Sequence, residues 1–243
     1  FIMKSKEKKI FYHKDEVTIG YYDKVFEKKS GVQSKWQHQK FNFIKKLMNN
    51  YSKHLDFGCS SGTFIGILNT KKESIGVDIS KSQISYAKSK YKKKNNKFYS
   101  TGLPLPFKNN TFDVVTILEV IEHCNKIDNT KIIKEIYRVL KPGGILIATT
   151  PNYSSLWPLL EKLISFFGPV DYTKQHVNYF NKKKLSFFFE KNNFIKQKVS
   201  TFIYFSPFVA SLSWSLSNLM EKIENNFFKT GFGFLLCGVF KKK

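Results

Sequence analysis

Arginine is nearly absent from this sequence. The 243 residues include 41 Lys and Arg against 18 Asp and Glu, a formal net charge of +23, yet Arg138 is the one arginine. Proteins that read nucleic acids favour the planar, bidentate guanidinium group, so a charge supplied by lysine does not favour a nucleic-acid partner. The chain is also rich in Phe, Ile, Asn and Tyr. We therefore interpret the lysine excess as a compositional bias.

Cysteine is scarce as well. Cys59, Cys124 and Cys237 are widely spaced and form no paired-thiol motif, which argues against a disulfide scaffold or a zinc ribbon and fits a reducing compartment. The lysine-rich first residues lack the apolar segment that is typical of a secretory signal. We expect a cytoplasmic protein.

Long hydrophobic runs are also missing. Val199–Met220 carries no charge, but it contains Pro207 and six serines, and it is therefore too polar for a membrane-spanning helix. Apolar residues recur there at helical spacing, which predicts an amphipathic helix and leaves peripheral contact with a membrane surface open. That stripe consists of Phe208, Leu212, Leu216, Leu219 and Ile223.

What the chain does have is core-forming material, with 42% hydrophobic and 16% aromatic residues. From residue 53 onward, short apolar runs alternate with helical patterns, and this alternation predicts an α/β fold with a doubly wound, Rossmann-like parallel sheet. The predicted helices begin at Phe64, Lys81 and Lys131. The predicted strands are His54–Phe57, Ser74–Asp78, Lys97–Ser100, Phe112–Leu118 and Ile145–Thr149.

The alternation breaks down late in the chain, where helical stripes are followed by two further strands. These strands are expected over Phe194–Phe205 and Gly233–Phe240, after a helix over Leu185–Lys191. We predict a helical lead-in over residues 1–50, with a helix over Gln33–Asn49, and a Rossmann-like core over 51–152. Cap helices and the final strands would occupy 153–243.

The most informative segment is the glycine-bearing turn Asp56–Gly62, which lies between a predicted strand and a predicted helix. Glycines there let the backbone turn sharply and approach a ligand closely. Asp78 follows Gly58 by 20 residues and ends the next strand, where an acidic side chain accepts hydrogen bonds from ribose hydroxyls. The combination predicts a nucleoside-containing cofactor.

Five motifs occur in one order: HLDFGCSSGTF at His54–Phe64, GVDIS at Gly76–Ser80, LPF at Leu105–Phe107, FDVVTILEVIEH at Phe112–His123, and RVLKPGGILIATTPN at Arg138–Asn152. With them the chain resembles the class I S-adenosylmethionine-dependent methyltransferases of the type-11, ubiquinone-methylase-like group. The resemblance implies a seven-stranded sheet whose last strand is antiparallel, with a helical cap inserted late in the chain.

The resemblance also implies how S-adenosylmethionine would bind. Gly58, Cys59, Ser60 and Gly62 would pass along its amino-acid portion, while Asp78 and Ile79 would hold the ribose and adenine. Two positions depart from the family pattern. Ser60 stands where the group usually has a glycine, and Thr101 stands where an acidic residue usually binds the adenine amino group. The full predicted set is Asp56, Gly58, Cys59, Ser60, Gly62, Asp78, Ile79, Thr101, Leu118 and Glu119.

The candidate catalytic and metal-binding residues begin after the fourth predicted strand. Glu119, Glu122 and His123 have i, i+3, i+4 spacing, so one helical turn would place them on a single face, and His176 could close the same site. Three interpretations remain open: structural contacts only, His176 or His123 as a general base, or a Mg²⁺ or Mn²⁺ site made by all four side chains. The metal interpretation rests on a resemblance of the E-x-x-E-H element to the divalent site of small-RNA 2′-O-methyltransferases and quinone-pathway O-methyltransferases.

The segment from Pro151 to Thr230 is expected to cap the carboxyl edge of the sheet. Its aromatic residues fit a lipid-linked or aromatic acceptor, or else form a small core of the cap itself. We predict an O-methyltransferase acting on a small, glycan or lipid-linked hydroxyl. The alternatives are C-methylation of a quinone precursor and a non-catalytic, membrane-peripheral cofactor-binding protein. The aromatic residues concerned include Tyr153, Trp157, Tyr172, Tyr179 and Trp214.

Overall fold

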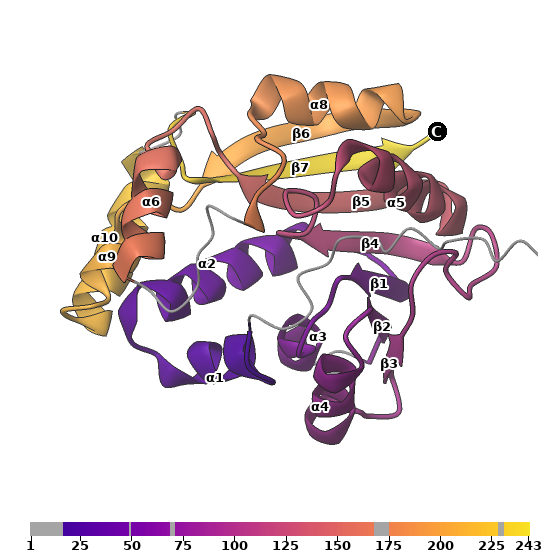
Figure 1. Ribbon diagram of the computed structural model, residues 1–243, viewed down its shortest axis with the longest axis horizontal. Helices are drawn as coiled ribbons and strands as arrows, with labels where there is room; N and C mark the ends of the chain where they lie inside the picture. The colour runs from indigo at the N-terminus through magenta and orange to yellow at the C-terminus, as the bar shows by residue number, and fades with distance from the viewer. Residues whose placement is uncertain (1–16, 49, 69–70, 168–174, 228–230) are drawn as a thin grey trace, which may run out of the picture.

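A computed structural model describes residues 17–48, 50–68, 71–167, 175–227 and 231–243. A seven-stranded sheet with strand order β3-β2-β1-β4-β5-β7-β6 runs through the molecule (Figure 1). The first five strands are parallel, whereas β7 is antiparallel to both β5 and β6. The predicted Rossmann-like class with an antiparallel last strand is confirmed. The strands are β1 Lys53–Phe57, β2 Glu73–Asp78, β3 Asn96–Ser100, β4 Phe112–Leu118, β5 Leu140–Pro151, β6 Phe194–Phe202 and β7 Leu235–Lys242.

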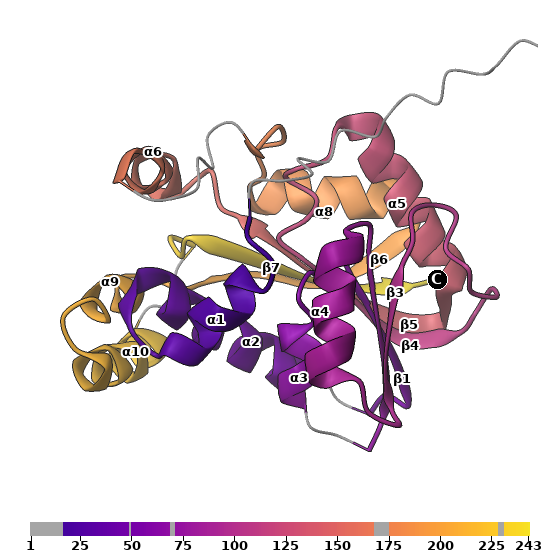
Figure 2. The same cartoon turned by 60° about the horizontal axis from the view of Figure 1, so that its bottom comes forward.

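Helices cover both faces of the sheet. α5 and α8 pack on one face, while α2 and α3 pack on the other, with α4 beside α3 (Figures 1 and 2). The described helices are α1 Tyr21–Lys28, α2 Gly31–Leu47, α3 Thr63–Leu68, α4 Lys81–Tyr91, α5 Lys126–Val139, α6 Trp157–Phe167, α8 Lys182–Lys191, α9 Ser206–Val209 and α10 Trp214–Phe227.

The alternation of side chains along β4 divides the core between the two faces. Val115 and Ile117 join the cluster under α5 and α8, whereas Val114 joins the cluster under α2. All three are at most 4% exposed, as expected for a strand covered on both sides. The sheet therefore holds the carboxyl ends of β1 and β4 in fixed positions, and the candidate site lies there.

Within the helical lead-in predicted over residues 1–50, α1 was not bounded as a helix of its own, and its one buried residue is polar. Asp23 is fully buried and accepts hydrogen bonds from the hydroxyls of Thr63, at 2.9 Å, and Tyr86, at 2.8 Å. Tyr91 and Lys90 also donate to it. α1 also has a short apolar stripe, because Tyr22, Val25 and Phe26 are half-buried at i, i+3 and i+4, and Phe26 packs against Phe41 with ring centroids 5.8 Å apart.

The predicted helical stripe after β6 is interrupted. Phe208 belongs to the short helix α9 and packs against Phe234, while α10 begins only at Trp214. β6 ends at Phe202 and β7 begins at Leu235, so both strands are shorter there than expected. Among the described residues, no helix combines the length and apolar character needed to cross a membrane.

Candidate active site

A pocket of about 190 Å³ opens at the carboxyl ends of β1 and β4. The glycine turn after β1 and the segment after β4 form one side, and α1, α2 and the start of α6 form the other. Several predicted residues line this pocket: Asp56, Gly58, Cys59, Ser60, Leu118, Glu119, Glu122, His123 and His176. Gly62, Asp78, Ile79 and Thr101 are not among the lining residues.

The glycine turn has the backbone geometry that its sequence suggested. Gly58 and Gly62 adopt φ values of 76° and 75°, and a Cβ on Gly58 would lie 2.5 Å from Val120. Ser60 also has a positive φ, 47°, which a side chain adopts only at a cost in conformational energy. The family preference for glycine at this position therefore has a local backbone reason.

Asp78 joins the end of β2 to this turn. One carboxylate oxygen accepts the Ser60 N–H at 2.9 Å, and the other accepts the Ser80 N–H at 2.8 Å. Burial raises the pKa of Asp78, although these two hydrogen bonds oppose the rise. Ile79 follows it and is 38% exposed, and the Thr101 N–H donates to the Asp78 carbonyl at 3.0 Å. These three residues form one rim that continues from the glycine turn.

Asp56, at the end of β1, is buried beneath the turn and accepts a hydrogen bond from the Thr116 hydroxyl at 2.6 Å. Burial raises the pKa of Asp56 to about 7, while the hydrogen bond from Thr116 and the nearby Lys40 ammonium act in the opposite direction. The side chain can therefore change its protonation state near neutrality when a charged group enters the pocket.

Glu119 does not share a helical face with Glu122 and His123, and this expectation was wrong. Residues 119–125 form a turn rather than a helix, and Glu119 has a positive φ of 53°. Its carboxylate instead faces α2, where it pairs with the Lys40 ammonium and accepts the Trp36 indole N–H at 3.1 Å. Because the backbone reverses at Glu119, the i, i+3, i+4 argument does not apply.

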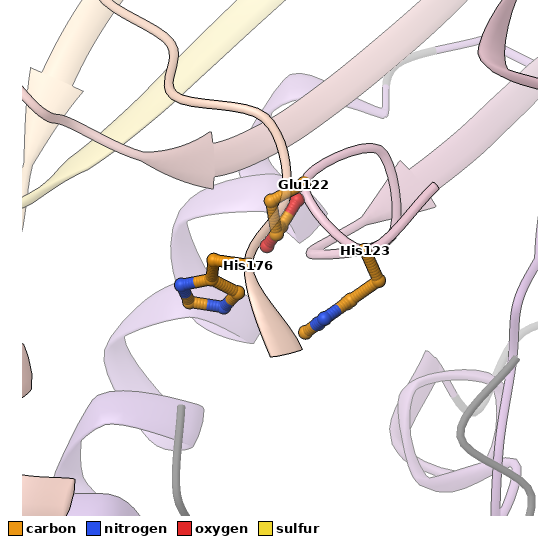
Figure 3. A group of neighbouring side chains, drawn as sticks. All are labelled: Glu122, His123 and His176. Carbon is orange, nitrogen blue, oxygen red and sulfur yellow. The ribbon is translucent and has the colours of Figure 1, made fainter. Parts of the chain in front are cut away.

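Glu122, His123 and His176 do come together (Figure 3). One candidate ligand atom from each lies within 4.8 Å of the others, and the two imidazole rings are 4.8 Å apart. The Glu122 carbonyl accepts the N–H groups of Val177 and Asn178 at 2.9 and 3.1 Å. These two backbone hydrogen bonds fix the distant histidine segment beside the turn after β4.

The Glu122 carboxylate is fully buried, and neither oxygen makes a well-formed hydrogen bond within the described residues. Burial raises its pKa to about 7, which the neighbouring His176 partly offsets. A buried, ionised carboxylate without hydrogen bonds raises the free energy of the folded state unless a proton, a cation or a ligand neutralises its charge. This side chain is therefore positioned to act on what enters the pocket.

His176 has two partners behind it that the sequence analysis missed. Its Nδ1 is hydrogen-bonded to the carboxylate of Glu161 on α6, and it also lies 2.9 Å from the Tyr153 hydroxyl. Tyr153 donates to both Glu161 oxygens, at 2.9 and 3.0 Å. Burial lowers the pKa of His176, but the hydrogen bond to Glu161 and the charges of Glu122 and Glu161 outweigh it, so the net shift is upward. Glu161 is the single acidic residue in the mostly apolar sequence of α6, a signal that could have drawn attention to it.

Sequence reasoning also missed the contribution of the N-terminal helices to the pocket. Tyr22 from α1, and Gln33, Trp36, Gln37 and Lys40 from α2, all line it. Tyr172, one of the predicted cap aromatics, lies outside the described residues. Trp157 does line the pocket and packs against Trp36 with ring centroids 5.1 Å apart. The cover over the site thus comes from both ends of the chain.

Comparison with known proteins identifies the family. Residues 55–148 match the family described as a methyltransferase domain. A demethylmenaquinone methyltransferase of Staphylococcus saprophyticus is 30% identical over 208 residues, which cover 75% of this chain and 87% of that protein. The chain belongs to the class I S-adenosylmethionine-dependent methyltransferases, in the type-11 group.

Other proteins similar to the chain differ in how much of their length they share with it. An uncharacterised protein of Methanocaldococcus jannaschii is 35% identical over 144 residues, and the match spans 50% of this chain but 60% of that protein. A crystal structure of a methyltransferase from Thermotoga maritima, described as a possible histamine N-methyltransferase, superimposes with a TM-score of 0.68 at 20% identity. That match covers 91% of this chain and 94% of the other, and it supports the fold.

Proposed function

We propose that this protein transfers the methyl group of S-adenosylmethionine to a hydroxyl of a small, glycan or lipid-linked acceptor, with His176 as the general base. The observation that carries the proposal is the buried arrangement of His176 against Glu161, in the same pocket as the glycine turn. A carboxylate that holds one imidazole nitrogen orients the ring and stabilises the cation formed when the other nitrogen takes a proton.

The cofactor residues divide into two groups in this proposal. The turn from Gly58 to Gly62 gives close backbone approach to the amino-acid portion of S-adenosylmethionine, and the Asp56 carboxylate supplies negative charge beneath it. The rim of Asp78, Ile79 and Thr101 would receive the ribose and adenine. S-Adenosylmethionine itself supplies an electrophilic methyl group on a sulfonium.

Methyl transfer then requires the acceptor oxygen to be positioned and deprotonated. The acceptor O–H bond breaks and its proton passes to His176, while the oxygen forms a bond to the methyl carbon as the carbon–sulfur bond breaks. Trp36 and Trp157, which line the pocket and pack against each other, would restrict water there. His123 packs beside His176 and would help to orient the acceptor.

A second candidate function is C-methylation of a quinone precursor. It is favoured by the Staphylococcus saprophyticus relative, whose name describes methylation of demethylmenaquinone. A base at His176 would serve this reaction also, by removing a phenolic proton and so increasing the nucleophilicity of the ring. The two functions differ in product, because one yields an ether and the other a carbon-bound methyl group.

A divalent cation is a further candidate for the same side chains. Glu122, His123 and His176 offer one carboxylate and two imidazoles, a donor set that suits Mn²⁺ or another transition metal better than Mg²⁺. The metal would polarise an acceptor hydroxyl. Glu119, the fourth predicted ligand, does not fit, because its carboxylate is held by Lys40 and Trp36.

The decisive experiment is radiolabelled methyl transfer from S-adenosylmethionine to a cell extract that is then separated into glycan, lipid and quinone fractions. We expect label in one fraction, with a loss of about 100-fold or more for His176→Ala. Full turnover of His176→Ala would refute the base, and full turnover after exhaustive chelation would refute the metal. Calorimetric binding of the cofactor without transfer to any fraction would favour a non-catalytic binder.

A further inference from the structure

The helix α10 presents its apolar side to the outside of the molecule. Leu216, Leu219, Ile223 and Phe227 follow one another at i, i+3, i+7 and i+11, so they form a stripe along one helical face. Their exposed fractions are 53, 55, 47 and 77%, and Leu212, just before the helix, is 88% exposed. An isolated exposed leucine is ordinary, but a continuous stripe of this kind indicates a contact surface.

The side of α10 that faces the protein is polar. Ser217 and Glu224 are buried, and the Ser217 hydroxyl donates to the Ser206 carbonyl at 2.6 Å. A Glu224 oxygen accepts the N–H groups of Phe205 and Ser206, both at 2.8 Å. The usual orientation of an amphipathic helix on a protein surface is therefore reversed. Hydrogen bonds of these buried polar groups, together with Trp214 packed edge-on against His38, hold this helix in place.

α2 supplies the remaining anchor. The Lys35 ammonium is 2% exposed and contacts the Asn218 side-chain oxygen at 2.5 Å and the Glu221 carboxylate at 2.7 Å. Glu221 and Glu224, the two acidic residues of α10, are therefore both paired on the side that faces the protein. The outer face keeps its apolar residues and Lys222, which is exposed.

The surroundings of the stripe are basic. Lys28 and Lys29 are exposed at the end of α1, and the Gly31 N–H two residues later donates to the Ala210 carbonyl at 3.1 Å, just before Leu212. The neighbouring Glu27 is paired with Lys90. An apolar stripe bordered by lysines is complementary to an anionic lipid surface, and two such surfaces would repel each other.

We propose that the outer face of α10 docks in the interfacial region of an anionic lipid bilayer, with the helix lying parallel to the membrane plane. The helix of 14 residues is about 21 Å long, enough for its stripe to enter the headgroup region along its length. α6 lies at the same end of the molecule, away from β3, in both views (Figures 1 and 2). Leu156, just before α6, and Leu159 within it are 57 and 59% exposed at that end as well.

The test is flotation of the full chain with vesicles of mixed phosphatidylglycerol and phosphatidylcholine, and with vesicles of phosphatidylcholine alone. We expect the protein to float with the anionic vesicles at low salt and several-fold less with the zwitterionic ones. The triple variant L216Q/L219Q/I223Q should lower the partition coefficient by more than about tenfold. A K28Q/K29Q/K222Q variant should weaken binding to the anionic vesicles alone.

Two controls make the test specific. I127Q/F187Q changes residues that are 70 and 67% exposed on α5 and α8, away from α10, and it should leave partition unchanged. Should the triple variant fail to fold, the single variant L219W replaces it, with quenching of its tryptophan emission by brominated phosphatidylglycerol as the measurement. The added tryptophan on the stripe should be quenched, whereas Trp214 packs against His38 and Lys35 on the inner side and Trp36 and Trp157 are only 8 and 6% exposed.

Several results would overturn the proposal. One is wild-type protein that remains unbound to anionic vesicles at low salt, and another is equal flotation of a folded triple variant. In a third, the wild type forms a concentration-dependent dimer in sedimentation, the triple variant stays monomeric, and neither protein binds vesicles. The stripe would then be covered by a second copy of the chain. None of these outcomes depends on which acceptor the enzyme methylates, so the proposed methyl transfer is tested separately.

Discussion

Glu161 is the residue on which the proposed base His176 depends most directly. Its carboxylate holds the Nδ1 side of His176, and it also accepts two hydrogen bonds from Tyr153. A side chain that contacts the base rather than the acceptor should affect proton transfer more than cofactor binding. We therefore regard Glu161 as a positioning residue.

The substitution Glu161→Gln should lower kcat by about 10- to 100-fold while leaving the KM for S-adenosylmethionine nearly unchanged. The Glu161 carboxylate contributes to the raised pKa of His176, so its loss lowers that pKa. Because the base acts in its neutral form, the acidic limb of the pH–rate profile should move to lower pH. The measurement is a kcat profile from pH 5 to 9 (about the range in which histidine titrates).

The matched control is Glu190→Gln on α8, where the side chain is 45% exposed and remote from the pocket. It should leave both kcat and the pH profile unchanged. An E161Q profile that keeps its acidic limb in place, whatever the loss in rate, would show that Glu161 does not act through the imidazole of His176.

The buried imidazole of His54 leads to a second prediction for a single residue. It is fully buried in β1, with one ring nitrogen 2.8 Å from the Thr116 hydroxyl, and burial lowers its pKa to about 3. In the unfolded chain the His54 imidazole is protonated below a pH of about 6.5, whereas in the folded chain it is protonated only near pH 3. The free energy of unfolding should therefore decrease progressively as the pH falls from about 6.5 to about 3. The contribution of His54 can reach about 1.4 kcal/mol per pH unit.

The free energy of unfolding should be measured by urea titration between these limits for the wild type and for His54→Gln. The difference between the two proteins isolates the histidine, because the other titrating groups are shared. The wild type should lose stability faster than the variant as the pH falls. Parallel curves would mean that the His54 ring is protonated, or solvated, within the folded state.

At the scale of elements, α1 depends on one buried carboxylate. Asp23→Ala should lower stability by about 2–3 kcal/mol, because the donors on Thr63, Tyr86 and Tyr91 lose their common acceptor. α1 should then detach locally, and trypsin should cleave at Lys28 or Lys29 several-fold faster. Limited proteolysis followed by mass spectrometry reports both sites.

Glu27→Ala provides the comparison, since Glu27 lies on the same helix but its pair with Lys90 is exposed and worth little. It should leave both the stability and the cleavage rate near the wild-type values. Equal protection of α1 in Asp23→Ala would show that apolar contacts, rather than the carboxylate, hold the helix.

A long apolar run was predictable from the sequence, whereas a short helix, a turn and a distant side-chain pair were not. β4 was bounded correctly as Phe112–Leu118 because it is a continuous apolar run between turn residues. α1 was not bounded as a helix because it has only eight residues and its one buried residue is Asp23. The turn after β4 was mistaken for a helix because spacing alone does not reveal that Glu119 adopts a positive φ. Glu161 was missed because pairing across 15 residues with His176 is a tertiary contact.

For the molecule as a whole, the net charge of +23 is the dominant electrostatic feature. Lysines that repel one another destabilise the compact state, and salt screens this repulsion over a Debye length of about 8 Å at physiological ionic strength. The Tm should therefore rise by several degrees when KCl is added at constant pH. Sucrose at matched osmolality controls for general solute effects, and a Tm that falls with KCl would show that paired charges outweigh the repulsion.

The position of β7 has a consequence for how the protein is made. β6 hydrogen-bonds within the sheet to β7, and β7 in turn separates it from β5. A nascent chain leaving the ribosome releases β6 and the helices that follow it before the strand that joins them to the rest of the sheet. Until β7 emerges, the backbone groups of β6 that later pair with it stay unpaired, so this interval is when chaperones have most to protect.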